Sequence, residues 1–232
     1  MNIDSFNWGP LNDDEYTKSI ILKEVFQNRI YEKYREVKTG DIVIDIGANV
    51  GSFTYSILPK NPKHVYCVEP SNTLIGTLRK NVECDKVTFI EKAIDDVECD
   101  NIPENGYGCI RGTYDTDTFS NIIQKNGINN IDFMKIDCEG GEYSVFTEEN
   151  KDFLLNRVSH IAGEWHMSGN EDFLAKFKKF RDIYLKDHKN YVIYDMRDID
   201  VSTWVVNDGY LEWYNKEATT GAQFIIYMTN KA

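Results

Sequence analysis

The most constraining feature of the sequence is a strand-like segment that passes through a glycine-containing turn directly into a helix-like run. Residues 41–57 read DIVIDIGANVGSFTYSI, so Asp45, Gly47, Asn49 and Gly51 alternate where the apolar segment ends. An apolar run broken by a single aspartate is typical of a strand buried on both faces of a parallel sheet. The turn is therefore either a tight connection only or a place where a nucleotide-like cofactor lies against the backbone.

Strand-like and helix-like segments alternate along the rest of the chain. Strands are expected at residues 41–46, 63–70, 86–94, 131–137, 158–166, 190–196 and 222–229, and helices at 52–58, 71–83, 117–127 and 173–186. A polar, glycine-containing stretch between residue 94 and the third helix is expected to be a loop. The alternation predicts an α/β fold, a mostly parallel sheet with helices on both faces. Residues 1–40 are expected to form an N-terminal helical cap, and residues 41–232 a single globular domain.

Charge and composition narrow the class of protein. The net charge of −12 disfavours a nucleic acid as partner, because an acidic surface repels phosphate backbones. The basic residues of segment 173–186 fall between regularly spaced aromatic residues, which is typical of an amphipathic surface helix. No apolar stretch is long enough for a membrane span, the N-terminus lacks a signal-peptide pattern, and the five cysteines form no Cys-x-x-Cys pair. A cytoplasmic protein without membrane association is expected.

Polar residues gather at the carboxyl ends of the predicted strands. Asp45 and Gly47 end the first strand, Glu69 ends the second, and Asp137 ends the fourth. Glu164 and His166 end the fifth, and alternation places them on one face of that strand. In open parallel sheets the ligand binds beyond the carboxyl ends of the strands. These residues are therefore expected to share one crevice.

The residues of the turn indicate the kind of cofactor. Gly47 would allow a ligand to approach the backbone, and Gly51 would keep the following helix close to the strand. Glu69, at the end of the next strand, can accept both hydroxyls of a ribose. The middle glycine of G-x-G-x-x-G is absent and an acid precedes the turn, which would suit an ammonium group or a sulfonium. This pattern favours S-adenosylmethionine over a nicotinamide dinucleotide.

Three segments, VIDIGANVGSFT, VYCVEPSNTLIGTLRKNV and IDFMKIDCEGGEYSVF, resemble the FkbM family of S-adenosylmethionine-dependent methyltransferases. The resemblance covers roughly residues 40–166. It implies the class I methyltransferase (Rossmann-like) fold, a seven-stranded mostly parallel sheet whose last strand is antiparallel. It also implies O-methylation of hydroxyls on saccharides or small secondary metabolites.

The resemblance also implies roles for individual residues. The methionine moiety would lie against Asp45, Gly47, Asn49 and Gly51, the ribose against Glu69 and Pro70, and the adenine against Ile94 and Asp95. Asp137, next to the first strand, would contact both cofactor and acceptor.

Methyl transfer to a hydroxyl also requires a group that takes up the hydroxyl proton. His166 could be this general base, with Glu164 beside it, since imidazole titrates near neutrality. Asp137 serves either the reaction or only the cap of the next helix, and Glu139 and Glu142 could cap that helix together. Asp137, Glu164 and His166 also resemble a hard-metal ligand set, but no motif demands a metal and none is predicted.

Some alternatives stay open at this level. The acceptor could be a carboxylate or amine of a peptide, the protein could be a non-catalytic binding module, or it could be a dehydrogenase. The aromatic residues of 204–214 form either a lid over a sugar ring or ordinary core, and residues 7–10 either close over the cofactor or pack elsewhere. The sequence indicates a small-molecule or saccharide acceptor and does not specify an oligomeric state.

Overall fold

The computed structural model describes residues 3–103, 113–167, 171–186, 190–195, 197–207 and 222–230. Its main sheet has seven strands in the order β3-β2-β1-β7-β8-β10-β9. They are β1 (Ile42–Ile46), β2 (His64–Val68), β3 (Val87–Ile90), β7 (Phe133–Ile136), β8 (His160–Met167), β9 (Tyr191–Tyr194) and β10 (Ala222–Thr229). β10 is antiparallel to both β8 and β9, whereas β3, β2, β1, β7 and β8 pair in parallel. The predicted fold class is confirmed.

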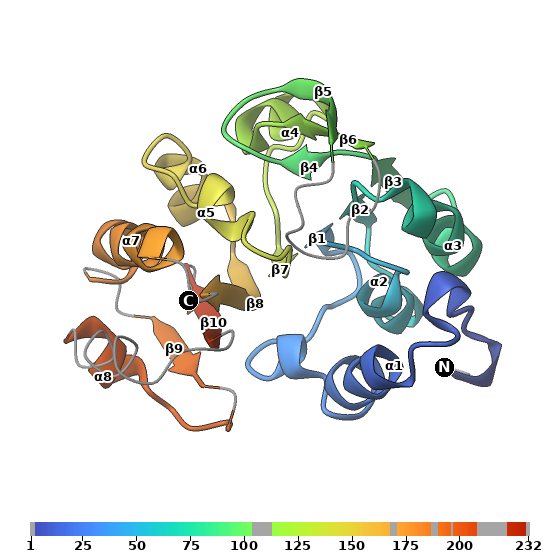
Figure 1. The fold of residues 1–232 in the computed structure, drawn as a ribbon, viewed down its shortest axis with the longest axis horizontal. Coiled ribbons are helices and arrows are strands. Elements are labelled where there is room, and N and C mark those ends of the chain that lie inside the picture. The colour runs from blue at the N-terminus through green and yellow to red at the C-terminus, as the bar shows by residue number, and fades with distance from the viewer. Residues whose placement is uncertain are drawn as a thin grey trace.

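Helices cover both faces of this sheet, as Figure 1 shows. One face carries α1 (Glu15–Ile21), α2 (Ser52–Ile57) and α3 (Asn72–Val82), and the other carries α4 (Phe119–Lys125), α5 (Glu142–Val145), α6 (Lys151–Arg157) and α7 (Glu171–Phe180). Alternation along β1 divides the core accordingly. Val43 belongs to the same core cluster as Phe53 of α2 and Leu78 of α3, whereas Ile44 belongs to the cluster that contains Phe119 of α4. A further helix, α8 (Ser202–Val206), follows β9, and a π-helical turn, Arg181–Leu185, extends α7.

The N-terminal segment consists of short helical pieces on the α2–α3 face. Around α1 lie 3₁₀ helices at Ile3–Ser5, Gly9–Leu11 and Ile30–Glu32 and a π-helical turn at Leu22–Gln27. The Trp8 ring packs edge-on against Phe6, with ring centroids 4.9 Å apart, and against Phe26 at 6.4 Å. The aromatic residue at position 8 therefore belongs to an aromatic cluster on this face.

The region after β3 differs from the prediction. The strand expected over residues 86–94 ends at Ile90, and its last two residues form β4 (Ala93–Ile94) in a second sheet of order β4-β6-β5. β5 (Cys99–Pro103) and β6 (Thr113–Asp117) lie in the stretch that was expected to be a loop. Thr116 of β6 is buried, and its hydroxyl accepts from the Cys99 N–H at 3.1 Å, so a polar side chain holds this small sheet together.

Within the described part of the chain, every helix is too short or too polar to cross a lipid bilayer.

Candidate active site

The turn between β1 and α2 is tied to the neighbouring strand β2. Gly47, Asn49 and Gly51 all have positive φ angles, of 73°, 52° and 87°. The N–H groups of Gly47 and Ala48 both donate to the Val68 carbonyl oxygen at 3.0 Å. This left-handed backbone brings the turn against the carboxyl end of β2, where Glu69 begins the next loop.

The two glycines of the turn are required by close contacts within the protein. A Cβ atom on Gly47 would stand 1.8 Å from the Asp137 carbonyl oxygen, so the turn and the end of β7 touch through their main chains. A Cβ on Gly51 would stand 2.8 Å from Cδ1 of Leu78 in α3. The absence of a side chain at Gly51 thus also permits a close approach of α3 to the start of α2.

Glu69 joins the turn to the following loop. Its side chain is buried, with Oε2 accepting from the Asn49 N–H at 2.7 Å and Oε1 from the Ser71 N–H at 2.8 Å. Burial raises the pKa of Glu69, although these two N–H donors act in the opposite direction. The carboxylate that was expected to face a ribose therefore contacts the 47–51 turn, as expected if these residues share one crevice.

Asp45 is placed differently from the expectation. Its side chain is fully buried behind the turn, where Oδ2 accepts from the Thr54 hydroxyl at 2.7 Å and Oδ1 lies 3.3 Å from Nζ of Lys135. Lys135 also donates to the Gly47 carbonyl oxygen at 2.7 Å. Burial lowers the pKa of Lys135, but the carboxylates beside it outweigh burial and raise the pKa, so the amine stays charged. Asp45 thus neutralises Lys135 and does not present its carboxylate to a ligand.

Asp137 is the partly exposed carboxylate at the centre of the site, with 28% of its side chain accessible. Its Oδ2 accepts from the Tyr31 hydroxyl at 2.8 Å, and the same hydroxyl lies 3.4 Å from Oε1 of Glu164. Glu164 is buried in β8, and its Oε2 accepts from the Gln223 amide of β10 at 2.6 Å. Burial and the Asp137 charge raise the pKa of Glu164 to about 8. Asp137 and Glu164 therefore lie together, as predicted, but through partners that the sequence did not reveal.

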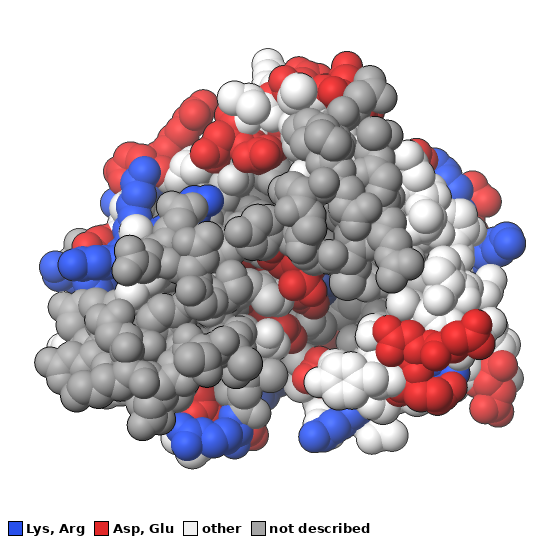
Figure 2. Space-filling view, viewed as in Figure 1, with Lys and Arg blue, Asp and Glu red and all other residues white. Residues whose placement is uncertain are grey.

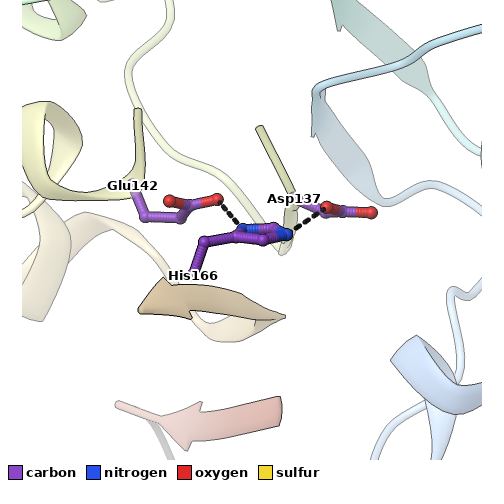
Figure 3. Close-up of side chains that lie close together, drawn as sticks. All are labelled: Asp137, Glu142 and His166. Carbon is purple, nitrogen blue, oxygen red and sulfur yellow. Dashed lines mark hydrogen bonds and ion pairs between the residues drawn. The ribbon is translucent and has the colours of Figure 1, made fainter. Parts of the chain in front are cut away.

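His166 lies between two carboxylates, as Figure 3 shows. Its Nδ1 is 2.9 Å from Oε1 of Glu142, and its Nε2 is 3.9 Å from Oδ1 of Asp137 and 3.6 Å from Oε2 of Glu139. Burial lowers the pKa of His166, but the hydrogen bond and charge of Glu142 and the charges of Asp137 and Glu139 raise it to about 10. The ring is therefore protonated at neutral pH, which corrects the expectation that it acts as a general base.

Glu142 stabilises the loop before α5. Its two oxygens accept from the N–H groups of Cys138 and Gly140 at 2.9 and 2.8 Å, while the side chain is fully buried. Of the two proposed roles, capping is the one that these contacts show. Among the described residues, Asp137, Glu142 and His166 each offer a ligand atom within 4.8 Å of the others. This group differs from the set that the sequence suggested, because Glu142 takes the place of Glu164. Glu142 already accepts three hydrogen bonds here, which accounts for its position without an ion.

The site as a whole is acidic. Figure 2 shows Asp and Glu side chains in a hollow near the middle of one face of the molecule. Burial and the Asp137 charge raise the pKa of the half-buried Glu24, which comes from the N-terminal segment. Burial likewise raises the pKa of Glu139. Carboxylates thus outnumber the two cations Lys135 and His166 around Asp137, and a ligand without negative charge is favoured.

The remaining predicted residues follow the ends of β2 and β4 or lie outside the described part of the chain. Pro70 is half-buried after Glu69, and Asp95 is half-buried after β4. Ile94 is buried, and its carbonyl oxygen would lie 3.5 Å from a Cβ on Gly141. The end of β4 therefore approaches the loop that follows β7. Trp204 is 37% exposed in α8, and the aromatic residues at 210–214 lie outside the described residues.

These features define a class of protein. The sheet has seven strands in this order with one antiparallel strand, and a glycine turn after β1 contacts an acid after β2. This is the fold of the class I methyltransferases. A family model described as the methyltransferase FkbM domain matches residues 45–193, more than half of the chain. The chain belongs to the FkbM methyltransferase family.

Solved structures share this fold at low sequence identity. A putative rRNA methylase from Clostridium thermocellum is 14% identical, with a TM-score of 0.52 over 89% of this chain and 96% of that chain. A phosphoethanolamine N-methyltransferase from Haemonchus contortus, solved with S-adenosylhomocysteine, is 10% identical, with a TM-score of 0.50 over 96% of this chain and 59% of that chain. At such identities the likeness extends to the fold alone. No curated protein matches the sequence.

Proposed function

We propose that this methyltransferase transfers a methyl group from S-adenosylmethionine to a hydroxyl of a saccharide or a small secondary metabolite. The observation that carries the proposal is the partly exposed Asp137 carboxylate, which lies at the end of β7 against the glycine turn that Glu69 also contacts. When bound, S-adenosylmethionine supplies an electrophilic methyl group. The residues that would hold it are those of the 47–51 turn, Glu69 and the rim at Pro70, Ile94 and Asp95.

The structure fits such a cofactor through Glu69. Its carboxylate is buried at a strand end and is oriented by two backbone N–H groups, at 2.7 and 2.8 Å. A carboxylate held in this way can also accept hydroxyl groups, because each oxygen has a second lone pair. The turn beside it provides backbone at positive φ, at Gly47, Asn49 and Gly51.

Asp137 takes the role of the proton acceptor in this proposal. His166 cannot serve, because its ring is already protonated at neutral pH. The imidazolium instead stabilises negative charge on Asp137 across 3.9 Å. Asp137 would accept the hydroxyl proton as the acceptor oxygen becomes bonded to carbon, which is the step that a general base promotes.

The surrounding charges support a neutral acceptor. Glu24 and Glu139 lie close enough to Asp137 for their charges to interact with it, whereas Glu164, with its pKa raised to about 8, is mostly neutral at pH 7. A carboxylate acceptor would be repelled by this group, which argues against methylation of a peptide carboxylate. A neutral polyhydroxyl compound meets no such repulsion and can donate hydrogen bonds to the same oxygens.

The test is transfer of a labelled methyl group to a panel of matched neutral, amine and carboxylate compounds. Asp137→Asn should reduce kcat by about 100-fold or more at saturating S-adenosylmethionine, since general-base catalysis contributes about 10²–10⁴-fold. Asp152→Asn, an exposed position in α6, is the matched control and should retain full activity. Full activity of Asp137→Asn, or preferential methylation of the carboxylate compounds, would contradict the proposal.

A further inference from the structure

Tyr31 reaches the acidic centre of the site from outside the family-matched segment, which begins at residue 45. It lies in the 3₁₀ helix Ile30–Glu32, and its side chain is buried, with 4% of the residue exposed. Its hydroxyl donates to Oδ2 of Asp137 at 2.8 Å and stands 3.4 Å from Oε1 of Glu164. A phenol from the N-terminal segment therefore lies between the two carboxylates of β7 and β8.

The turn that carries Tyr31 is held from several sides. The Tyr227 hydroxyl of β10 donates to the Ile30 carbonyl oxygen at 2.7 Å. The buried Glu32 carboxylate accepts from the Val37 N–H at 2.8 Å and from Nζ of Lys60 at 2.6 Å. These contacts fix the backbone on both sides of Tyr31, and they thereby fix the position from which its side chain extends into the site.

The ring of Tyr31 is fixed as well. It packs edge-on against Phe53 of α2 with centroids 5.7 Å apart, and Nζ of Lys135 lies 5.4 Å from its centroid. The hydroxyl carries a single proton and donates to one carboxylate at a time, and the shorter of its two contacts, at 2.8 Å, is the one to Asp137. Because that proton goes to Oδ2 of Asp137, the other oxygen, Oδ1, stays turned toward His166.

We propose that Tyr31 is a positioning residue for methyl transfer, whose hydroxyl fixes the Asp137 carboxylate and holds it apart from Glu164. The proposal rests on the proposed function, in which Asp137 accepts the proton of the acceptor. With Oδ2 engaged by Tyr31, Oδ1 is the oxygen left to receive that proton. Without the hydroxyl, Asp137 would lose its orientation and lie beside Glu164 with no donor between them.

The test compares Tyr31→Phe with Tyr16→Phe, a control in α1 whose tyrosine is 77% exposed. Tyr31→Phe keeps the ring and its contact with Phe53, so the thermal midpoint and the affinity for S-adenosylhomocysteine should stay close to those of the wild type. Its kcat should fall by about 10- to 100-fold, because a displaced catalytic group costs about this much, while the KM for the acceptor changes little. The Tyr16→Phe variant should match the wild type in every measurement. Unchanged kcat in Tyr31→Phe would overturn the proposal.

A second measurement does not depend on turnover. The Glu164 carboxyl carbon can be titrated by NMR in ¹³C-labelled protein, where its midpoint is expected near pH 8 in the wild type. Tyr31→Phe should raise this midpoint, because Asp137 would no longer be held apart and its charge would act more strongly against the charged form of Glu164. A role of Tyr31 in packing alone would leave the Glu164 midpoint in place, because phenylalanine retains the ring, and this outcome would overturn the proposal. If the wild type binds S-adenosylhomocysteine but methylates none of the panel, the proposed acceptor is wrong, and the titration still decides the role of Tyr31.

Discussion

Substitution of Gly47 by alanine should destabilise the fold strongly, because the new methyl group would overlap a main-chain atom. An alanine at φ 73° costs about 1–2 kcal/mol relative to a relaxed backbone. The Cβ atom would also stand 1.8 Å from the Asp137 carbonyl oxygen, and overpacking typically costs about 1–3 kcal/mol. The upper end applies, since the Asp137 N–H is bonded to Ile46 at 3.1 Å and the oxygen cannot move independently of the sheet. These costs add up to about 4–5 kcal/mol, and the reduced freedom of the unfolded chain offsets about 0.4–1 kcal/mol, so we expect a loss of about 3–4 kcal/mol in the free energy of unfolding.

Gly40→Ala is the matched control for this prediction. Gly40 has a φ of 87°, but a Cβ there would meet no atom within 4 Å. It should cost about 1 kcal/mol, because the backbone penalty is partly offset by reduced freedom of the unfolded chain. Urea denaturation followed by circular dichroism gives both values. Equal losses in the two variants would show that the contact between Gly47 and Asp137 has no energetic consequence, and would refute the reasoning.

Three further predictions follow from the buried charges. Lys135→Met should cost about 3–5 kcal/mol, because Asp45 is left buried and unpaired, and adding Asp45→Asn should restore part of the loss in the same denaturation assay. Burial raises the pKa of Glu164 from 4.5 to about 8. The neutral form of Glu164 therefore contributes its full share to the free energy of unfolding below pH 4.5, and this contribution is lost as the pH rises through 8. Glu164→Gln should flatten this decline in unfolding free energy between pH 5 and 8, and an unchanged slope would contradict the assignment. Glu69→Ala should weaken binding of S-adenosylhomocysteine by about 10-fold or more, measured by calorimetry, because hydrogen bonds to a charged group are worth about 1.5–3 kcal/mol.

Local patterns predicted the part of the site that is built from strand ends. An apolar run predicted β1, and the glycines that follow it and the acid after β2 both stand at strand ends. Parallel pairing brings these strand ends together, and Glu69 accepts a hydrogen bond from the Asn49 N–H. Asp137, Glu164 and His166 were found in the same way, since each ends a strand near the centre of the sheet.

The rest of the site depends on contacts that no local pattern encodes. Tyr31 and Gln223 meet Glu164 from opposite ends of the chain, 133 residues before it and 59 after it. The charge state of His166 follows from three carboxylates between the end of β7 and the start of α5, which only the folded structure brings near β8. The sequence places Lys135 in a strand that is buried on both faces but does not indicate its partner. Its pairing with Asp45 depends on the register between β1 and β7.

The position of β10 also determines when the sheet can be completed. β9 precedes β10 along the chain but pairs with it at the outer side, while β8 pairs with β10 at the inner side. During synthesis β9 therefore has no strand to join until β10 has left the ribosome, and β8 waits with an open edge that can pair with another molecule. A nascent or prematurely terminated chain that stops before Ala222 would lose two strands of the sheet at once, and aggregation during expression is its expected fate.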